Sequence, residues 1–442
     1  MKKLSKVLAL LLAVMMLVSM LAACGNTQPD PTNGATEPPK SGNEENTGSE
    51  ETQGGEVSTG LQPEEGASLT LWFDNDTYNE EIVALWNAKY PDVPLTVINV
   101  GTTDARQKNE LEGPTGTGAD VFVMAHDGVA VSAQAGNILE IDLLADEVRG
   151  SFVDNAIDAV TYDGKIYAFP LSMKTIVMFY NKDLVDTPVD TWADMKAFAA
   201  EYNDPAQNKF ACIWQAVEPY YAHGFLGGYG YDLFGENHDD PDQLGWDTPE
   251  AAEGLAFYKT LHDEIYPVAS ADATWDAMNS MFSAGECPYV ITGPWSIADF
   301  TNAGVNFGIA PLPKMDNGIR PKTLSTVDTV CVSSFTKYPV ASMLLAEFIA
   351  TDPGALELLY ETKNELTASI EGQKLDFYVN DPFMTSIAVA VNDALPQPYI
   401  PEMANVWAPY QKAIIAVWDD LQTPEEALAA AHNEFYSSLT TN

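Results

Sequence analysis

The chain has 442 residues, of which 46% are hydrophobic and 10% are aromatic. This length accommodates two or three domains of about 150 residues, and the composition excludes a mostly disordered or collagen-like chain. The 64 Asp and Glu residues outnumber the 21 Lys and Arg residues and give a formal net charge of −43. Because so negative a surface repels phosphate groups, we expect no nucleic-acid partner and no binding to anionic lipid headgroups.

The first 23 residues have the features of a secretory signal peptide. Basic residues near Met1 precede an apolar run over 7–23, which is shorter than the about 20 residues of a membrane-spanning helix. The run ends in Leu21-Ala22-Ala23-Cys24-Gly25, which resembles the lipobox of bacterial lipoproteins. The resemblance implies that Cys24 is lipidated and holds the protein on the extracellular face of the cell membrane. The alternative is an ordinary signal peptide with an incidental cysteine.

A polar tether is predicted over 24–66. It contains nine acids against the single base Lys40 and has no aromatic residue. Such a segment buries too little apolar surface to offset its ordering entropy, so we expect a disordered acidic spacer. Three further cysteines, Cys212, Cys287 and Cys331, lie in apolar runs. We interpret them as buried free thiols rather than as a disulfide with one spare thiol.

Residues 67–442 carry the alternation of strands and helices that is typical of α/β proteins. The first part predicts two strands around a helix that Pro91 ends, and then a buried strand over 120–124. The later part predicts strands and capped helices in alternation. These strands are 166–170, 176–180, 289–292, 307–310 and 329–332; the helices begin at 192, 249, 407 and 424. Thr191 and Thr248 are the predicted N-caps of the first two helices, a Thr423–Glu426 capping box opens the last, and the apolar stripe of the helix at 407 extends to Leu421.

Neither catalytic nor metal-binding motifs are evident. G-x-S-x-G, H-E-x-x-H and P-loop patterns are missing, and the five histidines form no ligand-like pair. Asp74-Asn75-Asp76 lacks the other EF-hand residues, and we interpret the acidic run 236–240 as a solvated loop. We therefore predict no catalytic residue, no metal and no cofactor. The 9 Trp and 19 Tyr residues suit a site in which ring faces cover sugar C–H surfaces, although most tryptophans serve in cores.

Six motifs, in order along the chain, resemble the maltose- and maltodextrin-binding proteins of ABC sugar importers, which are family 1 extracellular solute-binding proteins. The six matches are Ala119–Asp127 (ending A-H-D), Asp158–Pro170 (D-A-V-x-Y-x-G-K), Tyr180–Leu184 (Y-N-K-D-L), Glu218–Tyr220 (E-P-Y), Thr292–Trp295 (x-G-P-W) and Pro398–Pro401, which leads to Trp407. Each motif is modest alone, but together they cover nearly all of 67–442.

The resemblance implies an α/β, two-lobe, periplasmic-binding-protein-like fold with a hinge and an interlobe ligand cleft. The N-terminal lobe would comprise 67–172 and 329–378, and the C-terminal lobe 175–325 and 383–442. The implied function is capture of malto-oligosaccharides for delivery to ABC permease subunits by a lipid-anchored monomer that is not an enzyme. The alternatives are binding of another neutral oligosaccharide and, as a different class, a cell-surface glycoside hydrolase.

The same resemblance implies the residues of the carbohydrate site. Trp295, Trp407 and Tyr220 would stack on sugar rings, and Glu218 and Asp127 would accept hydrogen bonds from hydroxyls. Asp76, after the first strand, would be a further acceptor or simply part of a helix start.

Three positions depart from the pattern of the family. Met124 stands in place of a stacking Trp, Gly128 in place of an Arg, and Lys174 in place of a Glu. We still count Met124 and Lys174 among the residues expected to bind the carbohydrate. These departures leave the exact sugar, its chain length and its linkage open. Because Met124 lacks a flat ring, we expect the C-terminal lobe to supply most of the binding energy.

Overall fold

The computed structural model describes residues 60–440. The predicted signal peptide, the lipidation site Cys24 and the tether up to residue 59 lie outside these residues. Within 60–440, no helix combines the length and the apolar character needed to cross a membrane.

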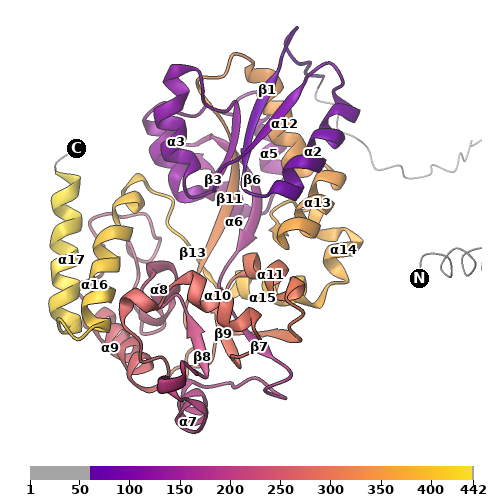
Figure 1. Ribbon diagram of the computed structural model, residues 1–442. Helices are drawn as coiled ribbons and strands as arrows, with labels where there is room; N and C mark the ends of the chain where they lie inside the picture. The colour runs from indigo at the N-terminus through magenta and orange to yellow at the C-terminus, as the bar shows by residue number, and fades with distance from the viewer. Residues whose placement is uncertain (1–59, 441–442) are drawn as a thin grey trace, which may run out of the picture. The chain divides into compact units, whose positions relative to one another are not determined.

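Two separate β-sheets form the frameworks of two lobes (Figure 1). The N-terminal lobe is built on a seven-stranded sheet in the order β12-β6-β11-β3-β1-β2, with β13 paired to β11. Its strands are β1 (Leu69–Phe73), β2 (Leu95–Asn99), β3 (Val121–Ala125), β6 (Ala168–Lys174), β11 (Leu324–Val332), β12 (Leu366–Thr367) and β13 (Leu395–Pro396). Strand β1 is parallel to β2 and β3, whereas β11 is antiparallel to β3 and β6.

Helices pack on the N-terminal sheet, and α2 shows how an apolar stripe turns toward it. In α2, Tyr78, Ile82 and Trp86 recur at helical spacing and are fully buried, and the Asn75 side chain caps the helix. The helices of this lobe are α2 (Asp76–Lys89), α3 (Ala105–Glu112), α4 (Val129–Gln134), α5 (Ala145–Ser151), α6 (Asp154–Ala159), α12 (Pro339–Thr351), α13 (Pro353–Lys363) and α14 (Asp376–Val379). A short hairpin, β4 (Thr161–Tyr162) and β5 (Lys165–Ile166), completes it.

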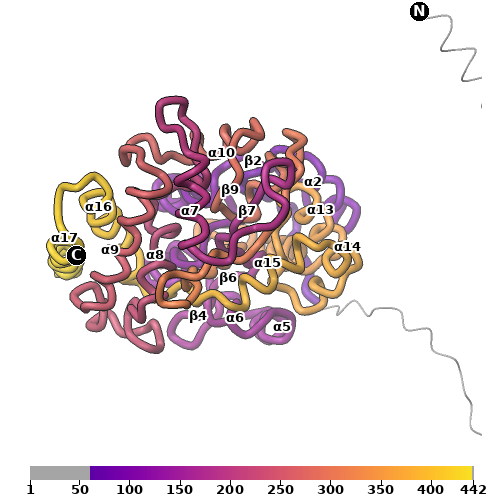
Figure 2. The backbone as a smooth tube through the Cα atoms, turned by 90° about the horizontal axis from the view of Figure 1, so that it is seen from below, coloured from indigo at the N-terminus to yellow at the C-terminus, as the bar shows by residue number. Residues whose placement is uncertain are grey.

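The C-terminal lobe is built on a four-stranded sheet in the order β10-β7-β9-β8. Its strands are β7 (Val177–Asn181), β8 (Cys212–Trp214), β9 (Tyr289–Thr292) and β10 (Phe307–Ala310). Its helices are α7 (Trp192–Tyr202), α8 (Pro219–Gly227), α9 (Pro249–Glu264), α10 (Trp275–Ser283), α11 (Ile297–Asn302), α16 (Trp407–Trp418) and α17 (Pro424–Leu439). Helices α16 and α17 pack together on α8 and α9, at one side of this lobe in both Figure 1 and Figure 2.

Three segments of the chain connect the lobes. Residues 175–176 join β6 to β7, residues 311–323 join β10 to β11, and the third segment includes α15 (Pro382–Asp393), which contacts both sheets. The first two are tied together by Thr175, whose hydroxyl lies 2.9 Å from the hydroxyl of Thr323 and 2.8 Å from the carbonyl of Leu324. The two-lobe α/β fold expected from the sequence is confirmed.

Buried His126 links the end of β3 to β11 and to the third of these segments. The backbone N–H of Val327 in β11 donates to His126 Nδ1 at 3.1 Å. His126 Nε2 lies 3.0 Å from the carbonyl of Gln397 in the third segment, so it must be the donor of that bond.

Several predicted elements are confirmed to the residue, and others need correction. Strands 289–292 and 307–310, the Thr191 and Thr248 caps and the Thr423–Glu426 capping box occur as predicted. Strand β11 begins at Leu324 rather than Thr329, because its polar residues find buried partners that a hydropathy pattern does not reveal. Leu421, assigned to the apolar stripe of the helix at 407, lies beyond α16 and is 71% exposed.

The tether ends earlier than predicted, because residues 60–66 contact the folded part of the chain. Leu61 packs against the core, and the Glu64 carboxylate accepts the backbone N–H groups of Val340 and Ala341 at 2.8 and 2.9 Å. Glu64 thus binds the otherwise unpaired donors in the first turn of α12. Composition alone placed this segment in the tether, because nothing in the sequence distinguishes Glu64 from the other acids of the tether.

The three cysteines of the described chain are confirmed as buried and unpaired. Cys212, Cys287 and Cys331 are fully buried and form no disulfide. Burial raises the pKa of the Cys287 and Cys331 thiols to about 12. Both thiols therefore stay protonated and unreactive at neutral pH.

His223 on α8 should make the stability of the protein depend on pH. Its ring is buried, and burial lowers its pKa from 6.5 to about 3. Below pH 6.5 the unfolded chain takes up a proton that the folded chain does not, so acidification destabilises the fold. From pH 7 to pH 5 this single group should remove roughly 2 kcal/mol from the free energy of unfolding. Urea denaturation at both pH values should show this loss shrinking in His223→Gln; an unchanged loss would contradict the assignment.

Candidate ligand-binding cleft

A cavity of about 430 Å³ lies between the two lobes. Seven of the eight residues predicted to bind carbohydrate line it. These seven are Met124, Asp127, Lys174, Glu218, Tyr220, Trp295 and Trp407. The other lining residues are Thr102, Thr103, Arg106, Ala125, Gly128, Thr326, Asp328, Gln397 and Ala404.

Trp295 and Tyr220 form an aromatic surface on the C-terminal lobe. Trp295 follows β9, and its indole folds back over Gly293, where a Cβ atom would lie 2.2 Å from the ring. Only glycine at 293 permits this position of the indole. The Tyr220 ring centroid lies 6.4 Å from that of Trp295. The Tyr220 hydroxyl donates to the carbonyls of Lys174 and Leu324, at 3.3 and 3.0 Å, so Tyr220 also contacts the end of β6 and the start of β11, next to two of the connections between the lobes.

Trp407 and Asp127 meet across the cleft. Trp407 opens α16 of the C-terminal lobe, and Asp127 lies in the turn after β3 of the N-terminal lobe. The indole N–H of Trp407 donates to Asp127 Oδ2 at 3.0 Å. The half-buried indole thus presents its ring to the cavity while its polar edge holds the carboxylate in place.

Glu218 brings a carboxylate to the C-terminal side of the cavity. It occupies the N-cap position of α8, directly before Pro219. Burial raises the pKa of Glu218 above its ordinary value, and the Gln411 amide lies 3.4 Å from its Oε2. Tyr220 follows two residues later, so one helix start places an acceptor and a ring side by side.

Gly128 allows Arg106 to enter the cavity wall. A Cβ atom at position 128 would lie 2.9 Å from Arg106 Cδ and 3.1 Å from Met124 Sδ. Arg106, from α3, thereby places a guanidinium beside Met124, and Glu110 accepts a hydrogen bond from it at 2.7 Å. Arg106 therefore occupies space that a side chain at position 128 would need.

Lys174 and Asp328 belong to a network of buried charges under the cavity. Lys174 Nζ contacts Asp328 Oδ2 and lies 3.8 Å from Glu365 Oε1. Lys363 Nζ lies 3.3 Å from the same Glu365 oxygen and 2.6 Å from Asp74 Oδ1. The network thus extends from the cavity to the end of β1.

The charges in this network compensate one another's desolvation. Burial acts to lower the pKa of Lys174, but attraction to Asp328 and Glu365 outweighs it, so the pKa of Lys174 is raised. Burial raises the pKa of Asp328 in spite of the nearby ammonium. For Glu365 the two lysines outweigh burial, and its pKa is lowered. Lys174 therefore remains a cation at the cavity wall at neutral pH.

One predicted residue lies elsewhere, and several lining residues were not predicted. Asp76 is exposed, accepts the side-chain amide of Asn99 at 2.6 Å and does not line the cavity. Asp328 was missed because the strand was predicted to begin only at residue 329, one position after it. Arg106 and Gln397 had no signal in the sequence, because only the tertiary fold brings α3 and the third connection to the cavity.

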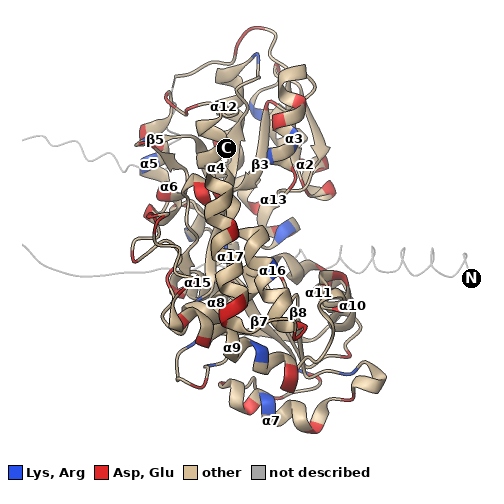
Figure 3. Cartoon of the chain, turned by 90° about the vertical axis from the view of Figure 1, so that its left-hand side faces the viewer, with Lys and Arg blue, Asp and Glu red and all other residues tan. Residues whose placement is uncertain are grey.

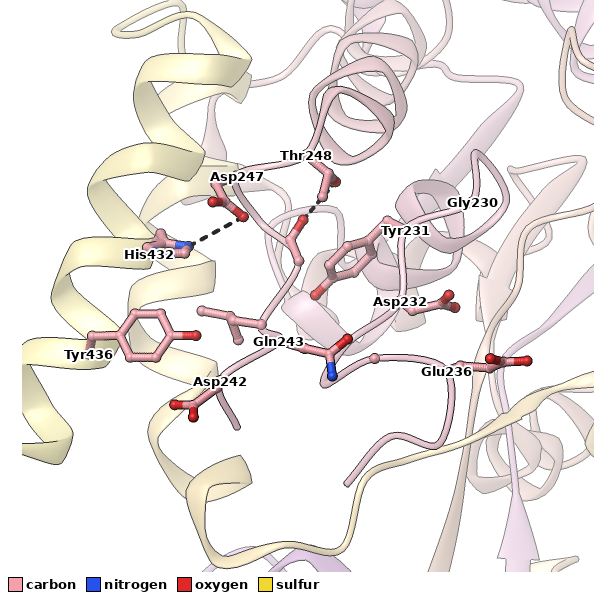
Figure 4. A pocket seen from close by; sticks show the side chains of 13 residues that line it. Gly230, Tyr231, Asp232, Glu236, Asp242, Gln243, Asp247, Thr248, His432 and Tyr436 are labelled. Atoms are coloured by element: carbon pink, nitrogen blue, oxygen red, sulfur yellow. Dashed lines mark hydrogen bonds and ion pairs between the residues drawn. The ribbon is translucent and has the colours of Figure 1, made fainter. Parts of the chain in front are cut away.

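A second cavity, of about 600 Å³, lies in the C-terminal lobe beside α17 (Figure 4). Its lining includes Asp232, Glu236, Asp242, Asp247 and His432, but none of the predicted site residues. Acidic residues also occur along both lobes in Figure 3, in keeping with the net charge. Within the described part of the chain, no group of three His, Cys, Asp or Glu residues is placed to hold a metal ion. Carboxylates alone therefore do not distinguish this cavity from the rest of the surface.

Two lobes that enclose rings, carboxylates and a cation in one cleft define a binding protein with an interlobe ligand site. The sequence profile of the bacterial extracellular solute-binding proteins matches residues 81–385. The chain belongs to this family.

The chain is similar to three characterised relatives along most of its length. It is 29% identical over 394 residues to the galactooligosaccharide-binding protein of Bacillus subtilis, covering 85% of this chain and 90% of that protein. It is 30% identical over 344 residues to the maltodextrin-binding protein MdxE of the same organism, covering 75% and 81%. It is 26% identical over 378 residues to a maltooligosaccharide ABC transporter solute-binding lipoprotein of Streptococcus pneumoniae, covering 83% and 86%.

Solved structures share the fold. A cyclo/maltodextrin-binding protein in complex with maltotetraose superposes with a TM-score of 0.72 at 28% identity, over 85% of this chain and 97% of that one. MalX of Streptococcus pneumoniae, in complex with maltopentaose, gives a TM-score of 0.78 at 24% identity, over 84% of this chain and all of that one.

Proposed function

We propose that this protein is the substrate-binding component of an ABC sugar importer and that it captures malto-oligosaccharides in the cleft between its lobes. The observation that carries the proposal is the cavity itself, in which Trp295 and Trp407 stand with the carboxylates of Asp127 and Glu218. Flat rings cover the C–H faces of a sugar, and carboxylates accept its hydroxyl hydrogen bonds. The maltodextrin-binding relative and the maltotetraose complex support this ligand class.

In this proposal, binding shifts the protein toward a closed state. Ligand contacts to Asp127 of one lobe and Trp295 of the other stabilise the arrangement in which both touch the sugar. The permease then receives the sugar from the closed form of a monomer. The protein does not change its ligand chemically, so it is not an enzyme.

A second ligand class has its own support. The galactooligosaccharide-binding relative matches 85% of the chain, a larger share than the maltodextrin-binding relative. Both sugars are neutral and polyhydroxylated, so either could use the same rings and carboxylates. Calorimetric titration with maltotriose, a galactotriose, cellotriose and xylotriose separates the candidates. We expect heat of binding with maltotriose; binding of galactotriose alone would establish the second ligand class.

Product analysis tests the class of protein. After long incubation with maltotetraose, chromatography should recover the intact sugar. Release of shorter sugars would identify a glycoside hydrolase and overturn the proposal.

Lipidation of Cys24 would fix the protein to the cell surface. Two acyl chains, at ~0.8 kcal/mol per buried CH₂ group, suffice for stable anchoring. Removing the acceptor thiol in Cys24→Ser should release the protein into the culture medium. A variant that stays as membrane-bound as the parent protein in cell fractionation would refute the lipobox assignment.

A further inference from the structure

Asp328 presents an unused hydrogen-bond acceptor at the wall of the cavity. Its side chain is fully buried, and its Oδ2 atom accepts from Lys174 Nζ. Its Oδ1 atom is also buried and has no hydrogen-bond partner among residues 60–440. A buried acceptor without a donor destabilises the protein, so such an atom beside a ligand cavity marks a position that a ligand can fill.

Glu365, the other acid beside Lys174, shows that membership of this charge network does not by itself leave a carboxylate oxygen without a partner. One oxygen of Glu365 accepts the hydroxyl of Ser172 at 2.6 Å, and the other lies 3.3 Å from Lys363 Nζ. Both oxygens of Glu365 are therefore engaged inside the protein. Glu365 does not line the cavity, whereas Asp328 and Lys174 both do. The half-engaged carboxylate thus belongs to the residue that lines the ligand site.

The aromatic surface brings a bound sugar to this pair. Lys174 Nζ lies 5.9 Å from the centroid of the Trp295 ring. The ammonium thus lies over the indole, so a sugar ring stacked there would come close to Lys174 and to the Asp328 carboxylate that Lys174 contacts. An ammonium only donates hydrogen bonds and a carboxylate only accepts them, whereas a hydroxyl does both.

We propose that Asp328 is a specificity-determining residue that, with Lys174, recognises two adjacent free hydroxyls of the sugar ring stacked on Trp295. Asp328 Oδ1 accepts the hydrogen bond of one hydroxyl, and Lys174 donates to its neighbour. The inference rests on the proposed function and names the part of the ligand that the site selects. A ring that lacks either hydroxyl, or carries it as a methyl ether, leaves one charged partner buried without its bond.

The test compares two neutral replacements in the same network. Asp328→Asn and Glu365→Gln each remove one negative charge near Lys174, but only the first touches the cavity. In maltotriose titrations, Asp328→Asn should weaken binding at least ~10-fold, as expected for a lost hydrogen bond to a charged group, and Glu365→Gln less than ~3-fold. Equal losses in the two variants would reduce Asp328 to a member of the ion network and overturn the inference.

A titration series with monodeoxy maltotrioses supplies a readout that a purely structural role would not change. The parent protein should bind at least one analogue ~10-fold more weakly than maltotriose, and Asp328→Asn should bind that analogue and maltotriose alike. An analogue penalty that persists unchanged in Asp328→Asn contradicts the inference. If Asp328→Asn does not fold, the double variant Asp328→Asn/Lys174→Gln, which leaves the network charge unchanged, is compared with Lys174→Gln. The penalty for the analogue that lacks the hydroxyl bound by Asp328 should persist in Lys174→Gln and vanish in the double variant; its persistence in both contradicts the inference.

Binding by the unmutated protein distinguishes a failure of the proposed function from a failure of the role proposed for Asp328. If it binds none of the trisaccharides, the proposed function fails. If it binds maltotriose and the two single variants lose affinity equally, the proposed function stands and only the role of Asp328 is overturned.

Discussion

Replacing Trp295 or Trp407 with alanine should weaken maltotriose binding at least ~30-fold in each case. Both indoles line the cavity from the C-terminal lobe, and Met124 on the opposite wall offers no flat ring. A stacked ring that behaves as an interface hot spot contributes ~2 kcal/mol or more, which corresponds to this loss of affinity. Titration calorimetry on the purified variants measures it.

Two control variants separate stacking from other effects. Trp86 is fully buried, with its N–H on the carbonyl of Val93 at 2.8 Å, so Trp86→Ala should lower the unfolding free energy by about 3–5 kcal/mol without directly changing the cleft. Trp407→Phe keeps a ring but loses the hydrogen bond to Asp127 and should retain more affinity than Trp407→Ala. Near-parental affinity in folded Trp295→Ala and Trp407→Ala would place the site elsewhere.

Removing Lys363 should cause the largest loss of stability of any single charge in the cleft region. Its ammonium lies between Asp74 and Glu365, and only 10% of its side chain is exposed. In Lys363→Met, three acids would share the single cation Lys174. Leaving a buried charge without its partner costs about 3–5 kcal/mol. Urea denaturation at pH 7.5 should show this decrease in the free energy of unfolding.

The pH dependence of this variant provides an internal check. Without Lys363, the folded-state pKa of Glu365 should rise, so the variant should recover part of its stability as pH falls and the acid binds a proton. Lys374, whose exposed ammonium pairs with exposed Glu371, is the matched control. Lys374→Met should cost less than about 1 kcal/mol. Equal losses in the two variants would show that burial of the Lys363 network does not matter.

Local sequence rules predicted those elements of the fold whose apolar pattern and caps agree. Strand β9 and the capping box of α17 are examples, since each depends on residues a few positions apart. The rules failed where polar residues are buried by distant partners. Strand β11 was predicted too short because Asp328 finds Lys174, which is 154 residues away.

The residues of the cavity also differ in how far the sequence predicts them. Trp295 and Glu218 stand in local motifs, so a resemblance in sequence is enough to predict them. Arg106 reaches the cavity because Gly128, on another element, leaves room for it, and no pattern around position 106 records that. Asp76 is the opposite case, a residue that was predicted for the site but lies outside it. It begins helix α2, and its carboxylate accepts a hydrogen bond from the side chain of Asn99.

A crystal structure of the protein with maltotriose tests the central claim most directly. We expect the sugar in the interlobe cavity, with one ring on Trp295, another against Trp407, and a hydroxyl within hydrogen-bond distance of Asp328 Oδ1. Maltotriose bound outside this cavity, for example in the acidic cavity beside α17, with the interlobe cavity free of sugar, would contradict it.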